Sequence, residues 1–291
     1  MTCRVKDAKL NKDIRGDPMC YSIKYQEGLV YVSIPYLTEL GFVNAFTTRV
    51  GGISQRLYDG LNLGLHTGDD PEAVIENRMR VARVLKSPLS SFVAGEQVHG
   101  NRVAIVTEVD KGKGATALET ALPKTDAMIT EVPGLFLMGF FADCVPVLLV
   151  DPISNGMGLV HAGWRGTASG ITKKCIEEMV KNFNTDPSSY IAVIGPSIGP
   201  CCYYVQENVA KEVEKSVPTI KDRIFYEDKG GYYLDLWGAN RAQLIGAGLI
   251  REKIFTTCVC TCCMSQLFFS YRATQGQTGR IGAFIGRVQC E

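Results

Sequence analysis

The chain has 291 residues, of which 46% are hydrophobic and 21% are charged, as expected for a globular protein with a sizeable core. Its 31 basic and 30 acidic residues give a formal charge of +1, which offers no electrostatic reason to expect nucleic acid or an acidic membrane as a partner. Apolar runs are shorter than a membrane helix requires and the charged N-terminus lacks a signal-peptide pattern, so we expect a cytoplasmic protein that acts on small molecules.

The N-terminal part predicts strands followed by a helix. We expect residues 1–28 to form a polar extension and residues 29–291 to form the functional domain. Residues 29–34 and 42–47 are rich in β-branched and aromatic side chains, which predicts two strands. A helix is expected to begin at Asp70, because a capping acid is followed there by proline and then by an apolar stripe of helical period that includes Met79.

The rest of the chain alternates between predicted strands and helices. Thr167 is the expected cap of a helix that buries Ile171 and Cys175. Strands are predicted at residues 103–109, 135–141, 145–150, 157–161, 190–194, 254–261 and 281–285, and further helices near 206–215 and 236–248. Several neighbouring strands are too close for helical crossovers. The predicted fold class is therefore α/β, a single domain of layered mixed β-sheets with flanking helices.

Three motifs place a histidine or cysteine beside small residues, at positions 96–100 (EQVHG), 142–146 (ADCVP) and 161–166 (HAGWRG). Cys144 precedes the predicted strand 145–150, and His161 ends the predicted strand 157–161. If these strands pair in antiparallel fashion, Cys144 and His161 meet at one sheet edge, and His99 must arrive from a separate loop.

Two imidazoles and one thiolate suit zinc, and three protein ligands leave the fourth tetrahedral position open for water or substrate. Copper is a substitute that the same nitrogen and sulfur ligands can bind. The pattern alone leaves open the alternative that these are three unrelated residues packed at strand ends.

A set of motifs in fixed order carries a family resemblance. They are residues 46–52 (FTTRVGG), 61–66 (LNLGLH), 97–100 (QVHG), 142–147 (ADCVPV), 161–166 (HAGWRG), 194–200 (IGPSIGP) and 268–272 (FFSYR). From about residue 42 onward the chain resembles the laccase-domain family, first described as multicopper polyphenol oxidases and later as purine nucleoside phosphorylases. The resemblance implies that His99, Cys144 and His161 bind Zn²⁺ in a layered α/β fold.

The same resemblance implies phosphorolysis of adenosine, inosine, guanosine and methylthioadenosine, together with deamination of adenosine. The expected partners are purine nucleosides and phosphate. Bacterial relatives are also described as peptidoglycan editing factors. The chain departs from the family pattern at Ala273, where relatives often carry a second arginine after the residue that matches Arg272, so no role of that second arginine carries over.

Three residues are candidates for catalysis. Asp143, next to Cys144, could act as a general acid or base or anchor a ligand imidazole, and the alternative is a carboxylate that accepts backbone N–H bonds. Arg49 and Arg165 could grip phosphate, because a guanidinium group presents a bidentate fork, and the alternative is a structural salt bridge.

Three further residues are candidates for substrate binding. His66 lies in a Gly/Asn-rich loop, where capping of the loop is an alternative. Trp164 and Tyr271 could stack on a purine ring, whereas packing in the interior is the usual role of such residues.

A separate run, CVCTCC at residues 258–263, contains the C-x-x-C pair Cys260 and Cys263. A structural zinc site needs a second pair, and only the adjacent Cys201 and Cys202 are available. Alternation along a strand would place residues 258, 260 and 262 on one face, where cysteine behaves as a small hydrophobe. We therefore favour packing over a second metal site.

Three other functions compete with the phosphorylase. A copper-dependent polyphenol oxidase would need a multinuclear cluster with many imidazole ligands, and the chain has 3 histidines. A cysteine hydrolase or amidase of peptidoglycan editing would use Cys144 as nucleophile and His161 or His99 as base, without zinc. In a non-enzymatic protein, the zinc would be structural and the surface would bind a cell-envelope partner.

Overall fold

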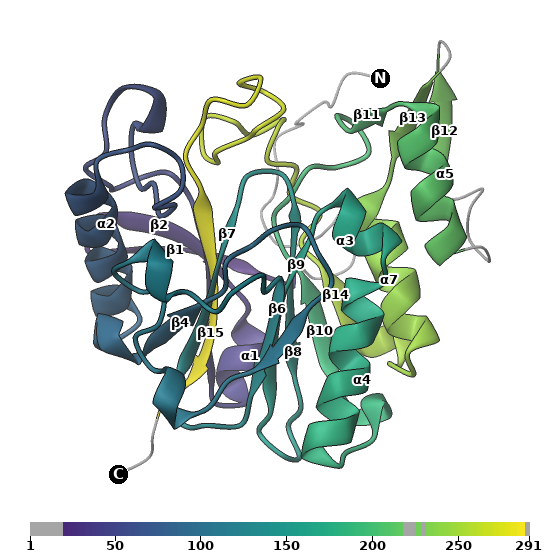
Figure 1. Cartoon of the computed structure of the whole chain (residues 1–291), viewed down its shortest axis with the longest axis horizontal. Coiled ribbons are helices and arrows are strands. Elements are labelled where there is room, and N and C mark those ends of the chain that lie inside the picture. Colours follow the sequence, from purple (N-terminus) through teal and green to yellow (C-terminus); the bar gives the residue numbers. More distant parts are fainter. Residues whose placement is uncertain (1–19, 218–224, 229–230, 289–291) are drawn as a thin grey trace.

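The computed structural model describes residues 20–217, 225–228 and 231–288, and its centre is a pair of six-stranded sheets (Figure 1). The first sheet has the order β1 (Ser22–Gln26), β2 (Leu29–Ser33), β3 (Phe42–Thr47), β15 (Ile281–Arg287), β7 (Phe136–Phe141) and β4 (Phe92–Ala94). The second sheet has the order β14 (Ile254–Thr256), β10 (Ile191–Ile194), β8 (Val145–Val150), β9 (Met157–Ala162), β6 (Ala127–Thr130) and β5 (Val103–Ile105).

Both sheets are mixed. Most neighbouring strands are antiparallel, whereas β4 pairs with β7, β5 with β6 and β10 with β14 in parallel fashion. This confirms the predicted α/β class with layered mixed sheets. Strand β1 lies within the segment that was expected to be an extension, and it pairs with β2 in the first sheet.

The molecule has four layers in the order helix, sheet, sheet, helix (Figure 1). Phe46 and Leu137 of the first sheet pack against Leu148 and Leu159 of the second, so an apolar core separates the two sheets. The helix α2 (Pro71–Val84) covers the outer face of the first sheet. The helices α4 (Ile171–Phe183) and α7 (Leu236–Gly246) cover the outer face of the second.

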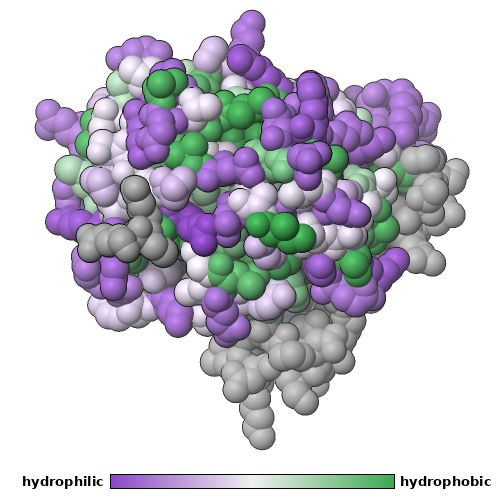
Figure 2. All heavy atoms as spheres, turned by 90° about the horizontal axis from the view of Figure 1, so that it is seen from below, coloured by the Kyte–Doolittle hydropathy of each residue, from purple (hydrophilic) through white to green (hydrophobic). Residues whose placement is uncertain are grey.

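Smaller elements complete the described chain. They are the helices α1 (Pro35–Glu39), α3 (Trp164–Ala168) and α5 (Glu207–Ser216), the strands β11 (Tyr204–Val205), β13 (Gly231–Leu234) and β12 (Phe225–Asp228), and the 3₁₀ turns η1 (Arg56–Tyr58), η2 (Leu89–Ser91), η3 (Glu108–Asp110), η4 (Leu118–Thr120), η5 (Pro187–Ser189) and η7 (Arg251–Lys253). Within the described residues, no helix is both long and apolar enough to cross a membrane. Seen from below, small apolar areas lie among polar side chains (Figure 2).

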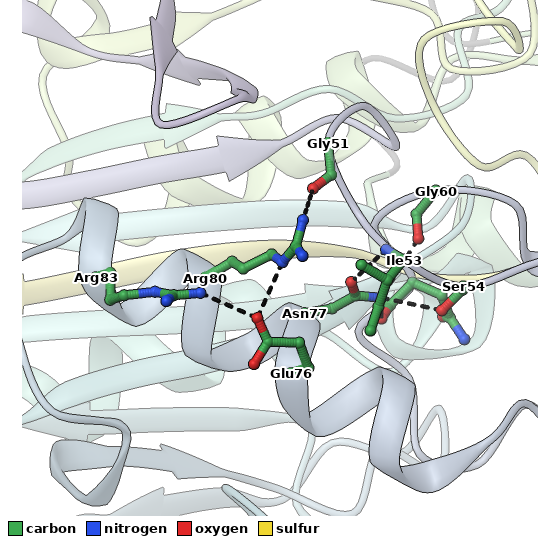
Figure 3. A network of polar contacts seen from close by, with 9 residues as sticks. Gly51, Ile53, Ser54, Gly60, Glu76, Asn77, Arg80 and Arg83 are labelled. Carbon is green, nitrogen blue, oxygen red and sulfur yellow. Dashed lines mark hydrogen bonds and ion pairs between the residues drawn. The ribbon is translucent and has the colours of Figure 1, made fainter.

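The helix α2 begins as predicted, because the Asp70 carboxylate accepts the Glu72 N–H and Pro71 is the first helical residue. Its buried face differs from the prediction at Met79, which is 40% exposed. Asn77 is buried instead, and its side chain binds the loop before the helix through Ile53 N, Ser54 Oγ and the Gly60 carbonyl (Figure 3). The exposed side of α2 carries ion pairs from Glu76 to Arg80 and Arg83.

Three predicted boundaries are wrong. Thr167 does not cap α4, because it is buried within α3 and Gly170 precedes α4. The strand predicted at 103–109 ends at Ile105. The strand predicted at 254–261 ends at Thr256, because Cys258 adopts a left-handed φ of 54° that a strand cannot continue through.

Candidate functional site

The candidate ligands Cys144 and His161 lie at one end of the second sheet. Strands β8 and β9 are antiparallel, with Val145 opposite Ala162 and Pro146 opposite His161. Cys144 directly precedes β8, so the register places its side chain at the sheet end where His161 lies. This confirms the predicted pairing of the two strands. The short link after Phe141 carries the chain from the first sheet to the second, so the site lies at the junction of the sheets.

His99 reaches the same place from a loop that Asp126 holds. The buried Asp126 carboxylate accepts the main-chain N–H groups of Val98, His99 and Gly100 at 3.3, 2.9 and 2.8 Å. His99 itself has a φ of 60°, a backbone conformation that is uncommon for a non-glycine residue and that clusters at functional sites.

Gln97 provides a second attachment for this loop. Its amide nitrogen donates to the Phe140 carbonyl at 2.9 Å, and its amide oxygen accepts the Phe140 N–H at 2.8 Å. Because Phe140 lies on β7, shortly before Cys144, the loop of His99 is fixed to the segment that carries the thiol.

The candidate ligand atoms of His99, Cys144 and His161 all lie within 4.8 Å of one another. The Nδ1 atom of His161 is hydrogen-bonded to Asp126 Oδ1 at 2.8 Å, which leaves Nε2 for a ligand. This is the arrangement in which a carboxylate orients an imidazole that binds a metal ion. The donor set suits a single zinc or copper ion, whereas a multinuclear copper cluster does not fit a chain with 3 histidines.

Charges at the site are coupled. Burial alone would raise the pKa of Cys144, but the positive charge and hydrogen bond of His161, together with His99, lower that pKa to about 6. Burial would lower the pKa of His161, but the Cys144 thiolate and the Asp126 carboxylate raise it to about 9. In the absence of a metal ion, the pair is therefore a thiolate and an imidazolium near neutral pH.

Gly163 leaves space for the side chains of Cys144 and His99. A Cβ atom at this position would lie 2.9 Å from Cys144 Sγ and 3.1 Å from His99 Cδ2. Its φ of −67° is accessible to any residue, so space, and not backbone conformation, requires glycine here.

A cavity of about 470 Å³ opens over the three candidate ligands, within the range typical of small-molecule sites. Its walls combine aromatic rings with cationic groups. They include Phe140, Trp164, Tyr203, Tyr271, Arg165, Arg272, Arg280 and His66. Although His66 is exposed, partial desolvation and the positive charges of Arg280 and Arg78 lower its pKa to about 4.

Asp143 carries the one carboxylate among the described residues that line the cavity. Its oxygens accept Thr261 Oγ1 at 2.6 Å, Ser270 Oγ at 3.0 Å and the Arg272 N–H at 2.6 Å. Asp143 therefore fastens the loop after β14 to the site, and it is Asp126 that orients a ligand imidazole. Its φ of 82° is a second uncommon backbone conformation at this site.

The two arginines named from the sequence lie in different places. Arg165 lines the cavity with its guanidinium 4.5 Å from the centre of the Trp164 ring. Arg49 is not among the described residues that line the cavity. Its guanidinium donates to the carbonyls of Asp59 and Ser265 and lies over the Phe269 ring.

Of the other residues named from the sequence, His66, Trp164 and Tyr271 line the cavity. Asp126, Tyr203 and Arg280 were not predicted from the sequence. The available signal for Asp126 was a single acid directly before the apolar segment that forms β6.

Comparison with known proteins gives consistent matches over most of the chain. The profile of the family described as multi-copper polyphenol oxidoreductase laccase matches residues 43–288. "Purine nucleoside phosphorylase YlmD" of Geobacillus stearothermophilus is 43% identical over 85% of this chain and 90% of its own length. The protein of the same name from Bacillus subtilis is 40% identical over 84% of this chain and 88% of its own length.

Solved structures agree with these matches. The crystal structure of YlmD from Geobacillus stearothermophilus has a TM-score of 0.89 and 40% identity, and covers 94% of this chain and 100% of its own. That of the hypothetical protein YfiH from Bacillus licheniformis has a TM-score of 0.87 and 38% identity, and covers 92% of this chain and 99% of its own.

Proposed function

Because the chain belongs to the family described as multi-copper polyphenol oxidoreductase laccase, and similar relatives bear the name purine nucleoside phosphorylase, we propose that it is a zinc-dependent purine nucleoside phosphorylase. Its substrates are phosphate and adenosine, inosine, guanosine or methylthioadenosine, and it also deaminates adenosine. The observation that carries the proposal is the convergence of His99, Cys144 and His161 beneath a cavity with aromatic and cationic walls.

The walls suit the two substrates. The rings of Trp164, Tyr203 and Tyr271 offer apolar faces on which a purine can stack. Arg165 and Arg272 offer guanidinium groups for phosphate oxygens. His66, with a pKa of about 4, is neutral near pH 7 and can exchange hydrogen bonds with ribose hydroxyls without adding charge.

Phosphorolysis breaks the bond between C1′ of the ribose and the purine nitrogen, and a phosphate oxygen forms the new bond to C1′. The electron pair of the broken bond leaves with the purine, which then takes up one proton. Asp143 is our candidate for proton transfer, because it carries the cavity carboxylate beside Cys144. The arginines hold the phosphate against the anomeric carbon and so reduce the entropy cost of bringing two substrates together.

The proposed metal ion is Zn²⁺ on His99, Cys144 and His161, with copper as a substitute. Bound there, it would supply Lewis acidity toward a substrate or water oxygen. The chain's own contribution is to hold the ligands: Asp126 fixes the His161 ring and the loop of His99, and Gly163 leaves space between Cys144 and His99.

The deciding experiment incubates the protein with inosine, with and without phosphate, and measures hypoxanthine and ribose 1-phosphate. Both products should form only with phosphate. Adenosine should in addition give inosine and ammonia. A sample with stoichiometric zinc that gives no phosphate-dependent product contradicts the proposal. His99→Ala and Cys144→Ala should each lose the metal and the activity.

One observation favours a second candidate, a cysteine hydrolase. Asp126, His161 and Cys144 are aligned as acid, imidazole and nucleophile, which is also the order of a thiol catalytic triad. Removal of the metal separates the two candidates: the phosphorylase loses activity with the ion, whereas a thiol hydrolase retains it and loses activity when Cys144 is alkylated.

A further inference from the structure

Four cysteines from two distant segments meet beside the cavity. Cys201 and Cys202 follow β10, and Cys260 and Cys263 follow β14. Their four Sγ atoms lie within 4.8 Å of one another. Cys263 Sγ is 3.4 Å from Cys201 Sγ and 3.4 Å from Cys202 Sγ. Neither the relatives' names nor the proposed function gives these thiols a role.

The backbone holds the two segments in register. Strands β10 and β14 are parallel neighbours, and the pairing continues past their ends as a bridge between Ser197 and Cys260. Ser197 donates its N–H to the Val259 carbonyl at 3.1 Å and accepts the Thr261 N–H at 3.1 Å. The two segments that carry the cysteine pairs therefore extend side by side from the same end of the sheet. Main-chain pairing thus holds the cysteines close together.

Main-chain N–H groups also point at the sulfur of Cys260. Gly199 donates to Cys260 Sγ at 3.2 Å, and Cys263 N approaches the same atom at 3.5 Å. Although burial opposes ionisation, these donors lower the pKa of the Cys260 thiol. Such N–H donors stabilise a thiolate, the form of cysteine that binds metal ions.

We propose that Cys201, Cys202, Cys260 and Cys263 form a second metal site, a tetrathiolate site that binds one zinc ion. Four sulfur ligands fill the tetrahedral coordination of zinc, so the site has no open position and is structural. It is distinct from the site of His99, Cys144 and His161, with which it shares no ligand.

A cation accounts for four thiols gathered in one place. Zinc binding would release their protons and offset the repulsion among four thiolates. Arg272, which donates to the Cys202 carbonyl at 3.0 Å, adds positive charge beside the cluster.

The proposed zinc site joins two segments that form part of the cavity wall. The segment after β10 supplies Ile198 and Tyr203 to the cavity wall, and the segment after β14 supplies Tyr271 and Arg272. A zinc ion bound by both segments would cross-link them and so stabilise this wall of the cavity. Its loss should weaken the wall and lower thermal stability while the site of His99, Cys144 and His161 keeps its own ion.

The test measures zinc and iron by elemental analysis in protein purified under reducing conditions without chelator. The wild type should carry about two zinc ions per chain, and Cys260→Ser/Cys263→Ser about one. His99→Ala/Cys144→Ala should also carry about one, and should lose it when Cys260 and Cys263 are replaced in addition. Cys258→Ser, two residues from the cluster, is the matched control and should keep about two.

A second readout does not depend on folding of Cys260→Ser/Cys263→Ser. In His99→Ala/Cys144→Ala, added Zn²⁺ should protect four thiols from a thiol-specific reagent, and Cys201→Ser alone should abolish this protection. Three outcomes overturn the proposal: zinc content unchanged by the Cys260 and Cys263 replacements, iron in place of zinc, or a disulfide among the four cysteines in metal-free protein as isolated.

Discussion

Asp126 holds His161 at two points: its carboxylate accepts a 2.8 Å hydrogen bond from Nδ1, and its carbonyl accepts a 2.7 Å hydrogen bond from the His161 main-chain N–H. The same carboxylate accepts the N–H of His99. One buried side chain therefore orients two of the three candidate ligands, although it is itself too far along the chain from either to be recognised as their partner.

Replacing Asp126 by asparagine should weaken zinc binding by about 10–100-fold, the usual effect of losing a group that orients a metal-binding imidazole. The shape of the side chain is retained, but its NH₂ group cannot accept hydrogen bonds. In place of Oδ2 it loses two of the three N–H donors of the His99 loop, and in place of Oδ1 it loses the third and the contact with the His161 ring. Competition with a chelator of known affinity gives the dissociation constant. Asp110→Asn removes a carboxylate that caps η3 and does not line the cavity, and it should leave that constant unchanged. Equal affinity in Asp126→Asn and wild type contradicts the positioning role.

Zinc affinity at this site should rise with pH. Between about pH 6 and pH 9 Cys144 is a thiolate and His161 is protonated at both ring nitrogens in the metal-free protein. In the metal complex His161 keeps the Nδ1 proton that faces Asp126 and has none on Nε2, so binding releases one proton and the affinity should increase about tenfold per pH unit. Below about pH 6 the thiol is also protonated and the slope steepens; above about pH 9 this contribution vanishes.

Chelator competition at several pH values measures this slope. In metal-free Cys144→Ser the histidine loses the thiolate that raises its pKa, so His161 should titrate at a lower pH than in the metal-free wild type. An affinity of the wild type that does not change between pH 7 and pH 9 would show that no proton is displaced from the pair.

The sequence predicted the meeting of Cys144 and His161 because their strands are neighbours in the chain and a short antiparallel pair has few registers. His99 was assigned through family resemblance, since a loop that arrives from another part of the chain leaves no periodic signal. Asp126 could not be predicted as the orienting group, because a single acid before an apolar segment is compatible with many surface roles.

The cysteine run shows how one residue changes such an interpretation. Alternation along a strand would have placed residues 258, 260 and 262 on one face, but the left-handed backbone at Cys258 turns the chain. Cys260 then pairs with the segment of Ser197, and the adjacent Cys201 and Cys202 become its neighbours. The pairing of β10 with β14 depends on the tertiary fold, and the local sequence does not encode it.

Replacing Gly163 by alanine should impair metal binding without unfolding the protein. The added methyl group would lie 2.9 Å from Cys144 Sγ, closer than packed atoms permit. Overpacking of this kind costs about 1–3 kcal/mol, which corresponds to roughly 5- to 140-fold in the zinc dissociation constant. Gly246→Ala, where a Cβ meets nothing within 4 Å, is the control and should bind zinc like the wild type. Tight binding by Gly163→Ala would place the ion elsewhere.

Replacing Arg165 and replacing Arg49 should have different effects on KM for phosphate. Arg165 lines the cavity, so Arg165→Ala should remove a charge-assisted hydrogen bond worth about 1.5–3 kcal/mol and raise KM for phosphate by roughly 10- to 140-fold, with a smaller effect on KM for inosine. Arg49 instead donates to the Asp59 and Ser265 carbonyls, so Arg49→Ala should lower Tm and leave KM for phosphate unchanged. Steady-state kinetics with each substrate varied, together with thermal unfolding of both variants, decide between the residues. A rise in KM for phosphate in Arg49→Ala at unchanged Tm would instead support a phosphate-binding role for Arg49.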